Sequence, residues 1–444
     1  MVPVGPERRG SLRMYSCGPA VDRPVHLGDL RSCLLSDLIR RTLEWSGRTV
    51  TSAQNITDVG HLADGSEPGP AGTSKVAALT EGRPQAGGQN QAQARGRAQN
   101  QAQAGGQAQN QAQAGGQGAL DVARHHEEAF RADCAALNIR PAEFTPRASE
   151  SIGLMTDLIG RLLASGHAYQ VPSGSVYFAA QSVPDYGVLS GIRLTDLPPG
   201  DRSGHAAEPG QRSTADWALW QAAPAGRELT WPAPWGTGFP GWPTECSALS
   251  LHFLGESIDV HTSGIDLRFP HDEQERAQSN SVTGHEAVQH WAHSERLLFD
   301  GDTMASPTGN VVLLGDVEAR KLDPLAVRLA VLEHRYRQPV GLTWDTLAAA
   351  DAAVRRWRDR VAEWANSPSR PMCAQYVGEF IAALEEDLDT PAALRSLRSL
   401  ESDSEIPPGS KFETFAFLDQ VLGLDLARDI GKAPAPRPRP PGAG

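Results

Sequence analysis

The N-terminal segment has the pattern of a strand, a helix and a second strand, and this pattern restricts the fold more than any other feature. Residues 12–16 have the apolar character of a strand, and leucines recur at helical spacing between residues 27 and 38. Gly47 can end that helix before a second strand-like run at residues 49–53. Because two strands joined by a crossover helix are the unit of a parallel sheet, we predict an α/β fold.

Length, charge and cysteine content limit the class of protein. With 444 residues the chain exceeds what one hydrophobic core usually organises, so we expect a core with an insertion and an appended domain. The formal net charge of -12 provides no global basic field, so any RNA contact needs a local patch. Charged residues interrupt every apolar run, which predicts no membrane span. An odd number of scattered cysteines without a secretory signal favours a cytoplasmic location; these are Cys17, Cys33, Cys134, Cys246 and Cys373.

A low-complexity segment separates the first strand-helix-strand unit from the rest of the chain. Between residues 65 and 118 the string Gln-Asn-Gln-Ala-Gln-Ala recurs at Gln89, Gln99 and Gln109, between glycines. This segment has almost no apolar side chains, so burial cannot offset the entropy cost of ordering it. We predict a disordered surface insertion.

Regular periodicity resumes after this insertion. Helical spacing of apolar residues covers 119–137 and 149–165, and a hairpin is predicted at 171–180 around Pro172, Ser173 and Gly174. Returning core elements are expected at 251–261 and 296–300. The chain is mainly helical from residue 324, with amphipathic helices expected at 351–364 and 375–388.

The four residues His26, Leu27, Gly28 and Asp29 stand between the first predicted strand and its helix. Exposed backbone N–H groups and the helix dipole favour phosphate at such a position, and a glycine lets a ligand approach closely. The histidine can donate to phosphate oxygens. Alone, this pattern is by default an ordinary turn.

Five further motifs change that interpretation, because together they resemble cysteinyl-tRNA synthetase, a class I aminoacyl-tRNA synthetase family. The motifs are residues 15–19 (YSCGP), 54–59 (QNITDV), 241–247 (GWPTECS), 261–266 (HTSGID) and 269–275 (FPHDEQE). The resemblance implies a Rossmann-like parallel sheet with an inserted connective subdomain and a C-terminal helical domain. It also implies ATP as a substrate, with Mg²⁺, and a Zn²⁺ ion that selects cysteine through its thiolate.

The resemblance assigns roles to individual positions. The implied zinc ligands are Cys17, Cys246, His271 and Glu275. Substrate contacts fall on Trp242, as an aromatic pocket wall, and on Cys246. Catalytic and ATP contacts fall on His26, Gly28 and Asp29, and further ATP contacts on Gly264, Asp266, Met304 and Ser306. Trp242 could equally be a core packing residue.

Elementary chemistry agrees with the zinc assignment. Thiolates, an imidazole and a carboxylate are all good ligands for this borderline-soft ion. His271 and Glu275 lie four residues apart, so on a helix they share one face and can hold a single ion.

The chain departs from the family at the second class I signature, Lys-Met-Ser-Lys-Ser. The matching residues 303–307 read TMASP, so both lysines are missing and Pro307 stiffens the loop. We expect slow adenylation unless another cation compensates, because cationic groups at a transferring phosphoryl group are typically worth about 100-fold or more in rate. Ala20, Pro243 and Asp272 also replace a threonine and two histidines of the family.

The C-terminal part is shorter than in the family, which predicts reduced anticodon readout. We therefore predict that residues 1–64 and 231–322 form the first and second halves of the catalytic core. Residues 119–230 form the connective insertion, and residues 323–432 form the helical domain. Residues 65–118 are a disordered insertion, and residues 433–444 are a disordered tail.

Three functions follow from these observations. The first is a cysteine–tRNA ligase that forms cysteinyl-AMP and transfers cysteine to tRNA(Cys). The second is a ligase that joins cysteine to a small amine, as the similar mycothiol-pathway enzyme does, although residues 29–32 (DLRS) resemble the tRNA-dependent version more closely. The third is a non-catalytic paralogue that binds zinc and cysteine, which the missing lysines favour. We expect a monomer that contacts no membrane.

Overall fold

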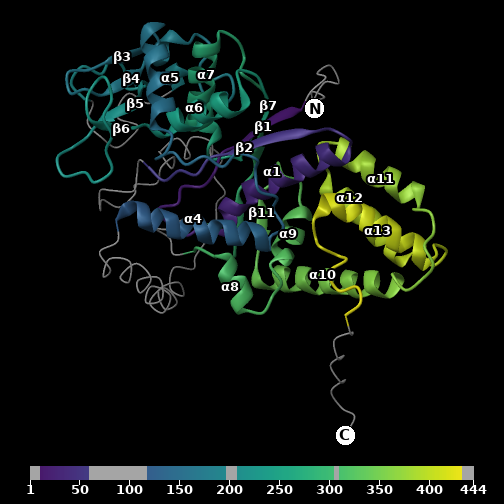
Figure 1. Ribbon diagram of the computed structural model, residues 1–444. Helices are drawn as coiled ribbons and strands as arrows, with labels where there is room; N and C mark the ends of the chain where they lie inside the picture. The colour runs from purple at the N-terminus through teal and green to yellow at the C-terminus, as the bar shows by residue number, and fades with distance from the viewer. Residues whose placement is uncertain (1–10, 60–117, 197–207, 305–309, 433–444) are drawn as a thin grey trace, which may run out of the picture.

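The computed structural model describes residues 11–59, 118–196, 208–304 and 310–432 (Figure 1). The predicted insertion lies outside this range apart from Gly118, and so does the predicted tail. Among the described helices, none has the length and apolar character needed to cross a membrane.

The central sheet is parallel, which confirms the α/β prediction. Its strands have the order β2-β1-β7-β8, and every neighbouring pair is parallel. The strands are β1 (Leu12–Ser16), β2 (Val50–Gln54), β7 (Ile258–Gly264) and β8 (Val288–Ser294). Helix α1 (Leu27–Trp45) joins β1 to β2 as predicted. The carboxyl ends of all four strands therefore meet at one edge, where α/β folds bind their ligands.

Two helices bring the second half of the chain to this edge. Helix α6 (Trp242–Leu254) packs against β1, β2 and β7, and α7 (Glu273–Thr283) packs against α6. A short helical turn, Arg268–Asp272, leads from β7 into α7. Helix α6 thus places its side chains directly beside the ends of the central strands.

An antiparallel sheet forms the connective part of the chain. It has the order β3-β4-β5-β6, with β3 (Ala168–Gln170), β4 (Val176–Phe178), β5 (Trp217–Ala222) and β6 (Gly238–Pro240). The helices α4 (Ala119–Ala136) and α5 (Ile152–Ala164) confirm the two predicted helices. The predicted hairpin is present, but its first strand is β3, which ends earlier than predicted. Gln170 of β3 pairs with Val176 of β4, so the residues between them form the turn. In Figure 1 this sheet lies to one side of the central sheet with α5, α6 and α7.

The C-terminal part contains a small sheet and a group of helices. The sheet has the order β10-β9-β11, with β9 (Leu297–Phe299), β10 (Asp302–Thr303) and β11 (Val340–Leu342). The helices are α8 (Leu314–Ala319), α9 (Leu325–Leu332), α10 (Trp344–Trp364), α11 (Ala374–Glu385), α12 (Thr390–Ser402) and α13 (Pro408–Leu422). Helix α10 begins earlier than predicted because Thr343 Oγ1 accepts a hydrogen bond from Thr346 N and caps it.

Helix α1 shares its hydrophobic core with the C-terminal helices. Leu34 and Leu38 of α1 belong to the same buried cluster as Val354 and Phe415, from α10 and α13. In Figure 1 the C-terminal helices lie beside α1, on the side away from the antiparallel sheet. The position of α1, and of the residues at its N-terminus, therefore depends on packing by elements far away in sequence.

A buried ion pair reinforces this connection. Asp37 Oδ2 accepts hydrogen bonds from Arg41 Nε at 2.7 Å and from an Arg328 guanidinium nitrogen of α9 at 2.6 Å. Arg328 also donates to the carbonyl oxygens of Leu422 and Leu137, so it joins the ends of α13 and α4. Burial raises the pKa of Asp37, but Arg328 and Arg41 outweigh burial and hold this pKa below its usual value. The carboxylate therefore stays ionised in the core.

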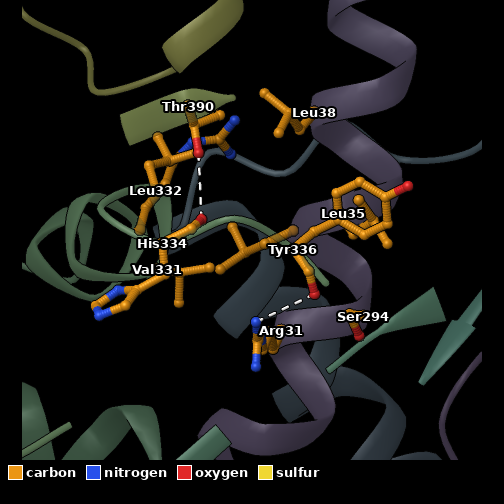
Figure 2. Close-up of a pocket in the computed structure, with 11 residues that line it drawn as sticks. Arg31, Leu35, Leu38, Ser294, Val331, Leu332, His334, Tyr336 and Thr390 are labelled. Carbon is orange, nitrogen blue, oxygen red and sulfur yellow. Dashed lines mark hydrogen bonds between the residues drawn. The ribbon is translucent and has the colours of Figure 1, made fainter. Parts of the chain in front are cut away.

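A small hollow, partly open to solvent, lies where α1 faces α9 and α12 (Figure 2). Aliphatic and polar side chains line it together: Arg31, Leu34, Leu35, Leu38, Ser294, Arg328, Val331, Leu332, His334, Tyr336 and Thr390. The guanidinium of Arg31 donates to the carbonyl oxygens of Arg296, Tyr336 and Gln338. Arg31 thus fastens α1 to the two segments that lead into β9 and β11.

Candidate functional site

Four buried donor groups converge beside the carboxyl ends of β1 and β7. Cys17 follows β1, Cys246 lies in α6, His271 lies in the turn Arg268–Asp272, and Glu275 lies in the first turn of α7. One ligand atom from each residue lies within 4.8 Å of the others. All four predicted zinc ligands are thus in one cluster, although they come from four separate elements.

The donor distances fit one tetrahedral ion. Cys17 Sγ lies 3.9 Å from Cys246 Sγ, 3.6 Å from His271 Nε2 and 3.4 Å from Glu275 Oε1. His271 Nε2 lies 2.8 Å from Glu275 Oε1. Ligands bound at about 2.0 to 2.3 Å around a tetrahedral zinc ion are about 3.3 to 3.8 Å apart. The cluster therefore needs only small adjustments to hold the ion, and its two sulfurs, one nitrogen and one oxygen suit zinc.

Glu275 is ionised, whereas the raised pKa values of Cys17 and His271 mean that these two donors hold protons that a metal ion must displace. Burial would raise the pKa of Glu275, but His261 and His271 outweigh burial and lower this pKa to about 2. Burial, followed by the neighbouring Cys246 sulfur, raises the pKa of the Cys17 thiol well above its usual value. Because only the thiolate binds metal, loading the site must release a proton from sulfur.

His261 is a neighbour of the cluster that the sequence interpretation did not single out. It lies on β7, and its Nε2 is 3.2 Å from Glu275 Oε2. This contact holds the second carboxylate oxygen and leaves Oε1 facing His271 and Cys17. His261 is part of the motif at residues 261–266, but its spacing gave no sign of a contact with α7.

Trp242 lies against the metal cluster. Its ring centroid is 4.6 Å from that of His271, and the side chain is only partly buried. Trp242 is the first residue of α6, and Pro243 follows it in the first turn. A proline fits there because the first N–H groups of a helix have no partner within the helix. Trp242 thus lies against one of the predicted zinc ligands, and its role as a pocket wall stays a prediction.

Glu245 connects α6 to the ends of β1 and β2. Its Oε1 accepts hydrogen bonds from Asn55 Nδ2 at 2.7 Å and from Thr57 Oγ1 at 2.9 Å. Asn55 Oδ1 in turn accepts a hydrogen bond from Gly18 N at 2.8 Å. Glu245 thus helps to fix Cys246, the next residue, relative to the strand that leads to Cys17.

The His26 to Asp29 segment forms the capped N-terminus of α1. His26 Nδ1 accepts a hydrogen bond from Asp29 N at 3.2 Å, and Asp29 Oδ2 accepts one from His26 N at 2.8 Å. Burial lowers the pKa of His26 below its usual value, although the Asp29 carboxylate acts in the opposite direction. Because Nδ1 is an acceptor, the neutral ring carries its proton on Nε2, which is free to donate to a ligand.

Gly28 is required by close packing at this turn. A β-carbon at Gly28 would lie 2.9 Å from His26 Cε1 and 3.4 Å from Met304 Cε. Any larger residue would therefore displace the histidine ring. The same distances show that Met304 reaches the signature segment, as expected for the ATP site, whereas Ser306 lies outside the described residues.

Gly264 and Asp266 lie beside the same end of α1. A β-carbon at Gly264 would lie 2.4 Å from Asp266 Oδ1 and 3.7 Å from Ser32 Oγ of α1. Asp266 is exposed. These two predicted ATP contacts, together with His26, Gly28 and Met304, thus surround one end of the signature helix.

Asp272, which replaces a family histidine, is built into a local network. Its Oδ2 accepts a hydrogen bond from Ser263 Oγ at 2.6 Å and lies 2.8 Å from His293 Nε2. The other replaced positions also fit locally, because Ala20 forms a parallel bridge with Thr57. These departures from the family therefore leave the backbone of the site intact.

Comparison with known proteins agrees with this geometry. A family model described as the catalytic domain of class I (C) tRNA synthetases matches residues 3–352. The cysteine–tRNA ligase of Salinibacter ruber is 36% identical over 454 residues, covering 95% of this chain and 81% of that protein. The corresponding ligase of Opitutus terrae is 37% identical over 425 residues, covering 94% of this chain and 82% of that protein.

Solved structures agree on the fold. Methionyl-tRNA synthetase of Mycobacterium tuberculosis, in complex with methionyl-adenylate, matches with a TM-score of 0.56 at 14% identity, over 93% of this chain and 90% of that one. A putative arginyl-tRNA synthetase from Campylobacter jejuni matches with a TM-score of 0.51 at 10% identity, over 96% and 93%. Sequence, fold and site geometry thus lead to one assignment: the chain belongs to the cysteine–tRNA ligase family of class I aminoacyl-tRNA synthetases.

Proposed function

We propose that the protein is a zinc-dependent ligase that activates cysteine with ATP and transfers it from cysteinyl-AMP to tRNA(Cys). The convergence of Cys17, Cys246, His271 and Glu275 on one point carries this proposal. When held by these four donors, a zinc ion would take the thiolate of cysteine as an additional ligand, and serine and alanine have no thiolate to offer.

Protein groups around the cluster would position the amino acid. Trp242 covers His271 and would pack against the substrate side chain. His261 and Glu245 hold the carboxylate of Glu275 and the helix of Cys246 in place, so the donors are fixed before a ligand arrives. This rigidity favours discrimination by chemistry at the metal over discrimination by pocket volume.

The start of α1 would bind the nucleotide. The positive end of the helix dipole favours phosphate there, and the Gly28 N–H is not used by the cap. His26 Nε2 would donate to a phosphate oxygen, and Asp29 holds the turn in shape. Gly264 and Asp266 lie where contacts with the adenosine would complete the site.

The first test is cysteine-dependent exchange of pyrophosphate into ATP, with serine as the matched substrate that lacks only the thiol. We expect exchange with cysteine and none above background with serine. The absence of exchange with cysteine would contradict an adenylating role and favour the non-catalytic paralogue, for which the missing lysines of residues 303–307 argue.

The second test concerns the acceptor. The two relatives described above are named cysteine–tRNA ligases, which favours tRNA over a small amine. We expect charging of tRNA(Cys) with labelled cysteine. Exchange without charging, together with transfer of cysteine to an amino sugar derivative, would favour the alternative acceptor.

A further inference from the structure

Arg23 is a cation beside the signature turn that no part of the assignment above uses. One guanidinium nitrogen lies 2.8 Å from Asp29 Oδ2, and the other lies 3.2 Å from Asp29 Oδ1. The Arg23 side chain is 39% exposed, so solvent or a ligand can reach part of it. Asp29 Oδ2 also accepts the His26 N–H, which places the Arg23 cation at the first turn of α1.

Several features around Arg23 favour an anion. His26 is 9% exposed, and its Nε2 has no hydrogen-bond partner within the described residues. The positive end of the α1 dipole lies at this turn, and the Gly28 N–H is not used by the His26–Asp29 cap. The Arg23 guanidinium adds a permanent positive charge at this point, and its donors, which pair with Asp29 in this structure, have a geometry that also matches phosphate oxygens.

The local charge shows why such a cation is needed. Asp22, Asp29 and Asp266 all act electrostatically on Arg23, so acidic groups surround the turn. A triphosphate would be repelled there without cationic support. The chain has only four lysines among its 41 basic residues, and none in residues 303–307, so this support must come from arginine.

We propose that Arg23 binds the phosphates of ATP during adenylation and compensates in part for the missing lysines. In this step a carboxylate oxygen of cysteine forms a bond to the α-phosphorus. The bond from the α-phosphorus to its bridging oxygen breaks, and pyrophosphate leaves with the electron pair. Arg23 stabilises the negative charge that develops on the departing pyrophosphate. This inference rests on the proposed function.

The test compares Arg23→Gln and Arg23→Lys with an arginine in a matched setting. Arg140 forms an ion pair with Glu44, and the exposed fractions are 39% and 27%, close to the 39% and 25% of Arg23 and Asp29. We expect Arg23→Gln to lower kcat/KM for ATP by about 100-fold in pyrophosphate exchange, with little change in KM for cysteine. Arg23→Lys should keep most of the activity, and Arg140→Gln should behave like the wild type.

A second measurement keeps the two hypotheses separate. Calorimetry measures the binding of a non-hydrolysable ATP analogue, which does not require catalysis. We expect Arg23→Gln to weaken this binding while the zinc content and the thermal unfolding of the protein stay unchanged. Unaltered analogue binding and exchange in folded Arg23→Gln would overturn the inference while leaving the ligase intact. A wild-type protein that binds the analogue through Arg23 but shows no exchange with cysteine would refute the proposed function alone.

Discussion

His26 and Asp29 cap each other at the start of α1: each backbone N–H donates to the other residue's side chain, at 2.8 and 3.2 Å. The cap has two consequences. It stabilises the first turn of the helix, and it fixes the tautomer of the histidine that faces the nucleotide site. A substitution at His26 should therefore affect both stability and catalysis, by amounts that can be measured separately.

Replacing His26 should reduce adenylation more than it reduces stability. His26→Asn keeps an oxygen that can cap the helix but loses the Nε2 donor, so we expect exchange to slow by about 100-fold. His26→Ala loses the cap as well and should cost about 1 kcal/mol of unfolding free energy. Pyrophosphate exchange and urea denaturation measure the two effects. Equal exchange rates in His26→Asn and the wild type would contradict a phosphate contact.

Metal content should depend on the two cysteines of the cluster, Cys17 and Cys246, and not on the buried Cys33. Cys246→Ser removes one sulfur from the cluster, so we expect loss of bound zinc together with loss of cysteine affinity. Cys33 of α1 is also buried but lies outside the cluster, which makes Cys33→Ser the matched control. Elemental analysis of the purified proteins measures their zinc content. Full zinc in Cys246→Ser would disprove the site as described.

Restoring a lysine should accelerate adenylation. Thr303 occupies the first lysine position of the second family signature and is exposed in β10. Thr303→Lys adds a cation on the chain segment that leads to Met304, and we expect pyrophosphate exchange to rise by at least about tenfold. Gln289→Lys, at an exposed position of β8, adds the same charge elsewhere and should have no effect. Equal rates in all three proteins would show that the missing lysine does not limit the reaction.

The buried pair of Asp37 and Arg328 should make stability depend on acid pH. The folded pKa of Asp37 lies below its usual 3.8, so the contribution of the pair is complete above about pH 5 and is lost as the pH falls through the folded pKa. Asp37→Asn leaves Arg328 buried without its carboxylate and should cost about 3–5 kcal/mol at neutral pH. We expect the difference between wild type and variant, measured by urea denaturation, to shrink below pH 4. A constant difference down to pH 3 would rule out this linkage.

Local signals in the sequence predicted much of the fold. The strand at 12–16 is β1, and the helices at 119–137 and 149–165 correspond to α4 and α5, because apolar periodicity alone defines such elements. Helix α13 lies within the predicted helical domain, but no bounds were predicted for it. Its apolar residues lie on all sides of the helix because several neighbouring elements cover it, so no helical periodicity marks it in the sequence. Only a polar segment marks its start.

The site was predicted in part, for a related physical reason. The motifs named the four donor residues, but their convergence depends on the pairing of β1 with β7 and on the packing of α6 and α7. Glu245 could not be given a partner, because Asn55 lies 190 residues away in the chain. His261 likewise reaches Glu275 only after β7 and α7 have come together. Contacts between distant segments are what the sequence pattern leaves open.

The tie between α1 and the C-terminal helices bears on how the protein can be shortened. The match to the catalytic-domain family ends at residue 352, inside α10. A fragment cut there would lack Phe415 from the core beneath α1 and the Leu422 carbonyl that receives Arg328. The end of the family-model match is thus not a limit of folding, and we expect a minimal folded fragment to extend at least to Leu426, the last buried residue of that core.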